Sequence, residues 1–173
     1  SGKDVTADIV LRVPDWIAGE PVVTINGTKT TVKVVNGFIR LSNTWKDGDV
    51  ITYTMPMELV PYDLPDNANV IAFKYGPIVL SANLGKENMI TSTTGVNVTI
   101  PTALSSISDV IKVNGTLDAW MADLSKNLVR KEGTLEFVLK NADRELVFSP
   151  HYMQHENRYG IYFEFIDDTS FKI

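Results

Sequence analysis

Cysteine is missing from the 173 residues of this chain. Its absence excludes catalysis by a thiol, zinc ligation by cysteine and a disulfide framework. No apolar run approaches the ~20 residues that a membrane-spanning helix needs, so we expect no membrane partner. A G-x-S-x-G turn and a Gly-rich phosphate loop behind a strand are also missing, which removes two common classes of enzyme from consideration.

Charge of one sign is not concentrated anywhere in the sequence. The 16 Lys and Arg residues are scattered among 21 Asp and Glu residues, and the net charge is -5. A nucleic-acid-binding protein needs a basic stripe, so we expect no nucleic-acid partner. Hydrophobic residues, in contrast, make up an ordinary 44% of the chain, which predicts a packed core rather than a disordered chain.

Alternation of apolar and polar residues dominates the first half of the chain, and a period of two is typical of strands. Two Asn-Gly pairs, at residues 26–27 and 36–37, stand between such runs. This dipeptide is a strong hairpin signal because both residues tolerate a positive φ. The runs that predict strands are Val5–Val13, Val22–Ile25, Thr31–Val35, Phe38–Leu41 and Val50–Met55.

The second half adds further strands and one segment of helical spacing. Residues 85–95 are polar and predict an exposed loop between strands. The strand runs are Val70–Phe73, Ile78–Leu80, Val96–Ile100, Leu135–Leu139, Glu145–Phe148 and Tyr159–Phe165. The residues at helical spacing, which predict a short helix, are Leu117, Trp120, Met121, Leu124 and Leu128. We expect an all-β fold of two small antiparallel β-sandwich units, with one short helix in the second.

The stretch from Pro61 to Asn67 is the best candidate for a linker between the two units. It combines two prolines, two aspartates and an asparagine, residues that interrupt regular structure. We therefore place the first sandwich in residues 1–66 and the second in residues 67–173. Limited proteolysis should cut near this boundary, or in the loop of residues 85–95, before it cuts any strand.

Several short motifs, taken in their order along the chain, carry a family resemblance from about Ile9 to Phe163. They are Leu11-Arg12-Val13-Pro14-Asp15-Trp16, Asn26-Gly27, Gly37-Phe38-Ile39, Trp45-Lys46-Asp47-Gly48-Asp49, Met55-Pro56-Met57, Ala72–Leu80, Pro150-His151-Tyr152 and Arg158–Tyr162. Each motif alone is an ordinary strand or turn. Their order resembles the C-terminal region of glycoside hydrolase family 127, the β-L-arabinofuranosidase-like enzymes.

That resemblance implies a supporting role for this chain. In the family a helical (α/α)₆ barrel carries the chemistry, with a zinc-bound cysteine and a glutamate, and two β-sandwich domains follow it. This chain has no cysteine and no long helical region, so no catalytic residue is carried over. The resemblance implies a non-catalytic accessory region that packs against a helical catalytic barrel of the same polypeptide. It also implies no cofactor for this chain and an extracellular or periplasmic location.

The start of the first sandwich leads to one further expectation. Family members have strand-forming sequence before the Leu-Arg-Val-Pro motif, and almost none precedes it here. We therefore expect the first sandwich to be truncated, with Ile9–Val13 or a neighbouring strand beside an unfilled place in the sheet. Unpaired backbone groups along such an edge are a template for another chain, so an edge-strand dimer is an expected partner state.

The alternative function is an independent carbohydrate-binding or adhesive β-sandwich. Flat aromatic faces with polar tips suit sugar rings, and Trp16, Tyr152 and Tyr159 are the candidate sugar-stacking residues. Trp45 and Trp120 are better interpreted as core residues, because they lie at a strand end and on the apolar side of the helix. An accessory module should expose an apolar patch, whereas a binding module should expose aromatic side chains among hydrogen-bonding groups.

His151, His155 and Glu156 form the one cluster that resembles a set of metal ligands. A structural zinc site needs about four closely spaced ligands and a catalytic site needs three with water. A surface loop with two histidines explains this segment better than a metal site. Asp47 and Asp49, which flank Gly48, are interpreted as turn residues rather than as a catalytic carboxylate pair.

Overall fold

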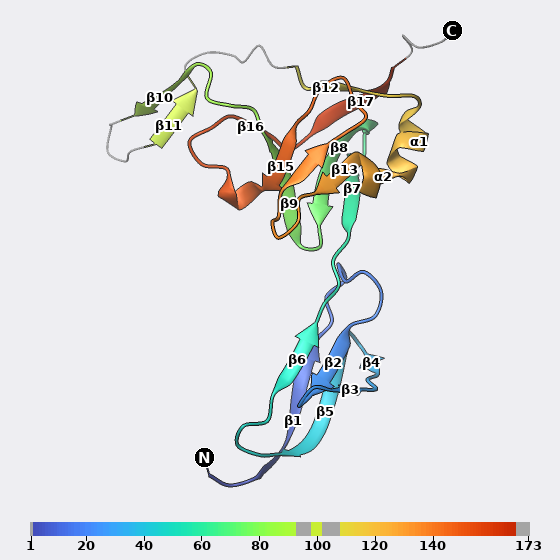
Figure 1. Ribbon diagram of the computed structural model, residues 1–173, viewed down its shortest axis with the longest axis vertical. Coiled ribbons are helices and arrows are strands. Elements are labelled where there is room, and N and C mark those ends of the chain that lie inside the picture. The colour runs from blue at the N-terminus through green and yellow to red at the C-terminus, as the bar shows by residue number, and fades with distance from the viewer. Residues whose placement is uncertain (1, 93–97, 102–107, 169–173) are drawn as a thin grey trace. The chain divides into compact units, whose positions relative to one another are not determined.

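The computed structural model describes residues 2–92, 98–101 and 108–168. The chain divides into two compact units, Ser1–Glu58 and Leu59–Ile173 (Figure 1). Strands dominate both units and the only helices among the described residues are short, which confirms the all-β prediction. Within those residues no helix has the length and apolar character needed to cross a membrane.

The first unit is a sandwich of two small sheets. Strands β1, β5 and β4 form one three-stranded sheet in that order, and β3, β2 and β6 form the other. Val23 from one sheet and Ile39 and Leu41 from the other are buried together between them. The strands are β1 (Val5–Arg12), β2 (Val22–Ile25), β3 (Thr28–Thr30), β4 (Val34–Val35), β5 (Phe38–Trp45) and β6 (Ile51–Thr54).

Both Asn-Gly pairs form the hairpins that the sequence predicts. Asn26 and Gly27 have φ values of 51° and 78° between β2 and β3, and Asn36 and Gly37 have 52° and 77° between β4 and β5. These are the positive angles that a two-residue hairpin turn requires. The expected single strand over residues 31–35 is wrong, because β3 pairs with β2 whereas β4 pairs with β5. Residues 31–33 instead cross from one sheet to the other.

A network of hydrogen bonds joins the first hairpin to the turn before β6. The Asn26 side-chain amide donates to an Asp49 carboxylate oxygen at 2.8 Å, and the Val50 backbone N–H donates to the side-chain oxygen Oδ1 of Asn26 at 2.8 Å. The Lys46 N–H donates to the other Asp49 oxygen at 2.7 Å. The bonds from Lys46 and Asn26 hold the pKa of Asp49 below its usual value. The predicted turn role of Asp49 is therefore confirmed.

The second unit is built on one long sheet that folds over so that its two halves face each other. Its strands run in the order β12-β17-β8-β9-β15-β14-β13, with β7 beside β8 and β16 beside β9. The β8–β9 hairpin joins the halves. Those in one half are β7 (Leu59–Leu64), β8 (Asn67–Tyr75), β12 (Val110–Val113) and β17 (Phe163–Asp167); those in the other are β9 (Ile78–Asn83), β13 (Leu128–Arg130), β14 (Phe137–Leu139), β15 (Val147–Pro150) and β16 (Tyr159–Gly160).

Aromatic rings fill the space between these two halves. Phe73 of β8 lies edge-on to Phe148 of β15 and to Phe165 of β17, with ring centroids 5.6 Å apart in both pairs. Phe163 adds a further edge-on contact with Phe148 at 5.8 Å. Because such contacts link β8, β15 and β17 directly, the folded sheet behaves as a sandwich with a single core. One pairing departs from the antiparallel expectation, since β12 and β17 run parallel.

The predicted short helix is present as two consecutive turns, α1 (Leu117–Ala122) and α2 (Leu124–Asn127). The Thr116 hydroxyl caps α1 by accepting from the Ala119 N–H at 3.3 Å. Trp120 is only 3% exposed and its indole N–H donates to the Lys140 carbonyl at 3.1 Å. Trp120 is therefore a core residue, as the helical spacing indicates.

The predicted domain boundary at residues 66 and 67 is misplaced by eight residues. The segment that resembles a linker contains β7, which pairs with β8 along its length, and residues 65–66 form the turn of that hairpin. β8 is the one strand in the described part of the chain that pairs with β7, and such an edge strand is where a sheet tolerates a proline such as Pro61. The boundary between the compact units follows Glu58.

Two further strand expectations need correction. Residues 85–95 do not form a loop throughout, because β10 (Met89–Ser92) pairs with β11 (Val98–Pro101); residues 93–97 lie outside the described part. The predicted strand over 159–165 is interrupted, since β16 pairs with β9 and β17 pairs with β8. A Cβ atom on Gly160 would lie 2.5 Å from the Phe163 ring, so this glycine allows the buried ring to pack against the backbone.

Candidate interaction site

The outer face of the β1-β5-β4 sheet carries apolar side chains where a sheet facing water normally carries polar ones. Val10 of β1, Phe38 of β5 and Val35 of β4 are 49%, 46% and 54% exposed. The register places Val10 opposite Arg40, and Phe38 opposite both Arg12 and Val35, so all of these side chains share one face. We call Val10, Val35 and Phe38 the apolar face.

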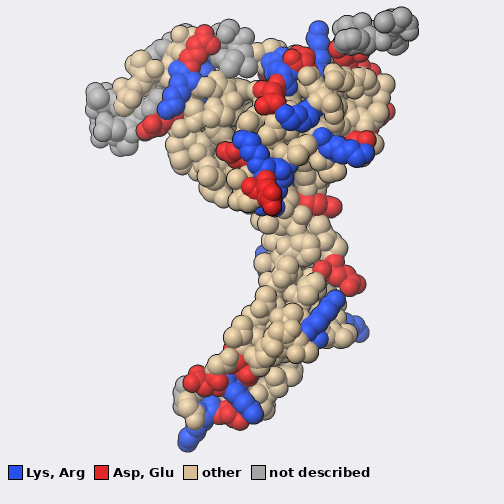
Figure 2. Space-filling view, viewed as in Figure 1, with Lys and Arg blue, Asp and Glu red and all other residues tan. Residues whose placement is uncertain are grey.

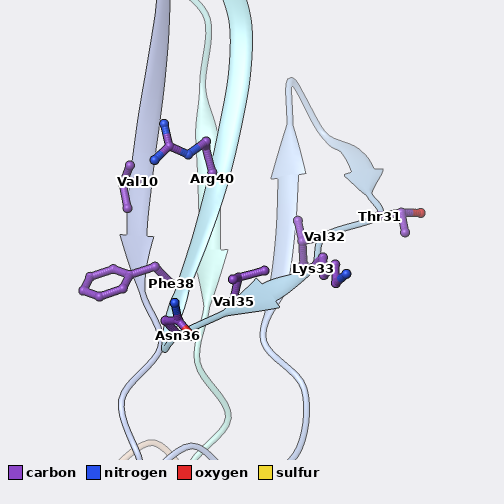
Figure 3. A pocket seen from close by; sticks show the side chains of 8 residues that line it. All are labelled: Val10, Thr31, Val32, Lys33, Val35, Asn36, Phe38 and Arg40. Atoms are coloured by element: carbon purple, nitrogen blue, oxygen red, sulfur yellow. The ribbon is translucent and has the colours of Figure 1, made fainter.

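A hollow of about 730 Å³ lies at this face (Figure 3). Figure 3 shows Val10 on β1 and Phe38 and Arg40 on β5, with Val35 beside them on β4. The remaining lining residues come from the segment that crosses between the sheets and from the second Asn-Gly turn: Thr31, Val32, Lys33 and Asn36. The break in the strand at residues 31–33 therefore makes the hollow, because it carries the chain away from the sheet face.

Cations flank the apolar side chains. The Arg40 guanidinium donates to Asp8 at 2.6 Å, and a hydrogen bond from Ser42, followed by this one from Arg40, lowers the pKa of Asp8. Lys33 lines the hollow from the opposite side and is among its exposed residues. The surface therefore suits a partner that offers apolar side chains together with a carboxylate.

The edge of β1 is a second unfilled feature of the first unit. Among the described residues β1 pairs with β5 alone. The Val13 N–H donates to the Gly37 carbonyl at 2.8 Å, which places the odd-numbered residues in hydrogen-bonded pairs with β5. Even-numbered residues such as Thr6, Asp8 and Val10 therefore direct their N–H and C=O groups away from β5. The Arg12 carbonyl, directed the same way, accepts from the Tyr53 hydroxyl at 2.8 Å.

The candidate sugar-stacking residues lie in different units. Trp16 is half-buried in the turn after Pro14, in the first unit. Tyr152 and Tyr159 are 62% and 49% exposed in the second unit, where Tyr152 belongs to a 3₁₀ turn, η1 (His151–Met153). The His151 ring lies edge-on to Tyr159 with centroids 4.7 Å apart. The structure thus brings His151 and Tyr159 together.

A polar network that the sequence did not indicate anchors the loop that carries these tyrosines. The Gln154 amide donates to the Ser149 hydroxyl at 2.7 Å and to the Ser81 carbonyl at 3.1 Å. The Asn157 side-chain amide donates to the side-chain oxygen Oε1 of Gln154 at 2.6 Å. His151 approaches the Ser81 hydroxyl at 3.3 Å. These contacts fix the loop against β9 and β15, so its exposed side chains project from a rigid base.

The segment with the candidate metal ligands is a surface loop. His155 and Glu156 are exposed, while His151 is half-buried against Ser81 and Tyr159. In the described part of the chain, no group of three or more His, Cys, Asp or Glu residues has the arrangement of a metal site.

On the face shown in Figure 2, Lys and Arg residues are interspersed with Asp and Glu residues over both units.

The apolar face was missed at the level of sequence, although a signal for it exists. Val10 stands in line with Asp8 and Arg12, at the positions of its strand that alternation assigns to water. Phe38 stands in line with Arg40, at the water-facing positions of the next strand. An apolar residue at the water-facing position of each of two neighbouring strands indicates a covered sheet face. The register that unites them in one patch came from the structure.

Two family profiles match the chain, and they meet at the boundary between the units. Residues 1–57 match the profile described as β-L-arabinofuranosidase, GH127 middle domain. Residues 61–165 match DUF4986, described as a domain of unknown function. The comparison with curated proteins gave no match.

Solved structures share the fold. The chain is similar to a glycoside hydrolase (17% identity, TM-score 0.59, covering 93% of this chain and 28% of that one). It is similar to a GH127 β-arabinofuranosidase at 15% identity and a TM-score of 0.54, and the match covers 95% of this chain and 28% of that one. A third similar structure is a GH127 β-L-arabinofuranosidase from Geobacillus stearothermophilus T6, at 16% identity and a TM-score of 0.52. The match covers 95% of this chain and 27% of that one. The chain therefore spans little more than a quarter of the length of these proteins.

Proposed function

Because the chain belongs to the DUF4986 family through residues 61–165 and matches the GH127 middle domain through residues 1–57, we propose that it is the accessory, non-catalytic region of a longer glycoside hydrolase. Its coverage of about 28% of two solved relatives leaves room for a catalytic domain elsewhere in such a polypeptide. The zinc-bound cysteine that the resemblance implies for the catalytic barrel has no counterpart here, since the chain has no cysteine.

The apolar face is the observation that carries this proposal. Val10, Val35 and Phe38 lie about half exposed around one hollow, on a sheet face that an independent module would cover with polar side chains. A fixed partner within the same polypeptide removes these side chains from water. Burying them contributes about 25 cal/mol per Å² of apolar surface removed from water. Lys33, which lines the hollow together with the ion-paired Arg40, favours a partner that presents a carboxylate beside its apolar residues.

The test compares one substitution in two settings. Phe38→Asp, introduced into the full-length product of the gene that encodes this chain, should lower the melting temperature and weaken hydrolysis of an aryl β-L-arabinofuranoside. In the 173-residue chain the same substitution should change the melting temperature little, because Phe38 is 46% exposed there. Val50→Asp is the matched control, since Val50 is 59% exposed in the same unit and does not line the hollow.

Two results would contradict the accessory role. One is an equal effect of Phe38→Asp in both settings, which would place its role inside the first unit. The other is hydrolysis by the purified 173-residue chain that disappears when one of its own acids is changed. Neither result would depend on the identity of the sugar that the longer enzyme cleaves.

Carbohydrate binding is the second candidate function, favoured by the loop around η1. Tyr152 and Tyr159 present exposed rings on a base held by Gln154 and Ser149, and rigid aromatic side chains bind at a low entropic cost. Titration with arabinofuranose-containing oligosaccharides should shift NMR signals of this loop, and Tyr152→Ala or Tyr159→Ala should abolish the shift. Unchanged spectra at millimolar sugar would remove this candidate.

A further inference from the structure

A hollow of about 530 Å³ lies on the second unit, lined by the loop that follows η1 and by the turn before β14. We propose that it binds a neutral oligosaccharide. Its volume is typical of small-molecule sites, which span about 300–1,000 Å³. The inference rests on the second candidate function, carbohydrate binding, and deepens it by assigning the side chains that recognise the hydroxyl groups of the sugar. The lining includes Asn83, Leu135, Glu136, Ser149, Met153 and Asn157.

The strand register builds the floor of this hollow. Phe148 of β15 is buried and stands opposite the buried Ala82 of β9. Because successive side chains of a strand point to opposite faces of the sheet, the next residues, Ser149 and Asn83, point to the outer face. Glu136 joins them from the turn before β14. Polar side chains from three separate segments therefore line one hollow.

Contacts within the unit hold the walls in place. Met153 is 59% exposed and stands in one wall. Gln154 fastens this wall by donating to the Ser149 hydroxyl and to the Ser81 carbonyl. Leu135, which is half-buried, lies in the wall that the turn forms. The hollow is therefore formed before a ligand arrives, and its apolar side chains suit the C–H groups of a sugar ring.

Two of the polar side chains have hydrogens to donate. The Asn83 Oδ1 atom accepts from the Gly85 N–H at 2.9 Å, and in the described part of the chain no group accepts from its Nδ2 atom. The Ser149 hydroxyl accepts from Gln154, and its own hydrogen has no acceptor among the described residues. The oxygen of a sugar hydroxyl accepts such bonds.

Two further side chains have oxygen atoms that can accept. Lys131 donates to Oε2 of Glu136 at 2.8 Å, and no described residue donates to Oε1. The Asn157 amide donates to Gln154 and to the Arg158 carbonyl, whereas no described group donates to its Oδ1 atom. Because each hydroxyl group both donates and accepts, a lining with both kinds of group fits a polyol better than an ion.

The charge of the hollow favours an uncharged ligand. Glu136 is the only charged side chain among the described residues that line it, and its ion pair with Lys131 balances that charge. The carboxylate of an anionic sugar would find no unpaired cation in this lining and would lie near Oε1 of Glu136, and such like-charge contacts weaken binding.

Tyr159 extends the site beyond the hollow. The register of β16 places Tyr159 opposite Asn83, so its ring, which is 49% exposed, stands on the same face of the sheet beside the hollow. A flat aromatic face with a polar tip suits a second sugar ring. The ligand is therefore an oligosaccharide, with one ring in the hollow and the next on Tyr159.

NMR titration of the 173-residue chain tests the site, with arabinotriose, xylotriose and cellotriose as neutral sugars and trigalacturonate as an anionic one. At least one neutral sugar should shift the side-chain amide signals of Asn83 and Asn157, and trigalacturonate should bind about tenfold more weakly. Asn83→Asp keeps the acceptor for Gly85 and removes both amide hydrogens, so it should weaken binding about tenfold. Asn67→Asp is the matched control, because Oδ1 of Asn67 also accepts from the N–H two residues on, at 3.0 Å, and does not line the hollow.

Met153→Ala is a second variant at an exposed position and should weaken binding several-fold by removing an apolar contact. Hydrogen exchange at β9 and β15 checks that each variant is folded. Shifts confined to Tyr152 and Tyr159, with an affinity that Asn83→Asp and Met153→Ala leave unchanged, would overturn this site and retain carbohydrate binding. Trigalacturonate that binds as tightly as the neutral sugars would also overturn it. Absence of binding by all three neutral sugars would overturn both the site and the second candidate function.

Discussion

The two units of this chain differ in how many buried side chains stabilise them. In the first unit three residues, Val23, Ile39 and Leu41, form the fully buried core. In the second unit fourteen of the residues whose burial is described form the core, and the phenylalanine rings link strands from both halves of the sheet. Small β units with few buried side chains depend more on turns, edges and neighbours than large ones do.

That difference explains where the unfilled surfaces occur. The apolar face and the edge of β1 that no described strand covers both belong to the unit with the small core. The second unit buries many of its aromatic side chains within itself, and two of the tyrosines that it exposes, Tyr152 and Tyr159, flank a loop held by side-chain hydrogen bonds. We therefore expect the first unit to gain stability from partners and the second to be stable alone.

The largest effect should come from the aromatic core of the second unit. Phe73→Ala removes edge-on contacts with Phe148 and Phe165 and leaves a cavity, which should cost about 3–5 kcal/mol of unfolding free energy. Hydrogen exchange in urea should show the second unit opening earlier while the first is unchanged. Tyr62→Ala, at a 53% exposed site in the same unit, is the control. Equal loss of protection in both units would show that they unfold together.

The next effect should break the first unit selectively. Ile39→Ala removes one of its three buried side chains and should cost about 2–5 kcal/mol. Because so little core remains, amides of β5 and β2 should lose their protection even without denaturant, while β8 and β9 keep theirs. Retained protection in β5 would mean that the turns and the outer face hold this unit more strongly than its core does.

A smaller effect is expected at the close approach in the second unit. Gly160→Ala places a methyl group 2.5 Å from the Phe163 ring, which is 2% exposed and has no free space to move into. Such overpacking should cost about 1–3 kcal/mol. Denaturant unfolding measures the loss, and the double variant Gly160→Ala/Phe163→Leu should recover part of it. No change in the single variant would show that the ring shifts freely.

The smallest effect should be the acid sensitivity of the first unit. Hydrogen bonds hold the pKa values of Asp8 and Asp49 below 3.8 in the folded state, so the unfolded state binds protons first as the pH falls. The contribution of these carboxylates is complete above about pH 5 and is lost as the pH falls through the folded pKa values. Unfolding measured from pH 6 to 3 should show this slope, and Asp8→Asn/Asp49→Asn should flatten it.

Local chemistry made part of this fold predictable. Both Asn-Gly hairpins are confirmed because a two-residue turn depends on the φ values of its own residues. The Thr116 cap and the buried Trp120 follow from helical spacing in the same way. At these positions neighbours in sequence decide the structure, so no knowledge of distant strands is needed.

Features that depend on distant partners were not predictable. Residues 61–67 have the composition of a linker, but β7 is a strand because β8 lies beside it. The run over 159–165 looks continuous, yet Gly160 and Phe163 belong to separate strands, because β16 pairs with β9 whereas β17 pairs with β8. Val10 and Phe38 form one patch only through the β1–β5 register.

The parallel pair β12–β17 has a consequence for the order in which the chain is synthesised. β17 lies between β12 and β8, so neither of these earlier strands can complete its pairing until Phe163–Asp167 has left the ribosome. The described strands of the first unit, β1 to β6, are all available once Thr54 has emerged. During translation the small sandwich can therefore form while the aromatic side chains of the larger one wait exposed, and a chaperone that binds apolar segments has its longest opportunity at β8.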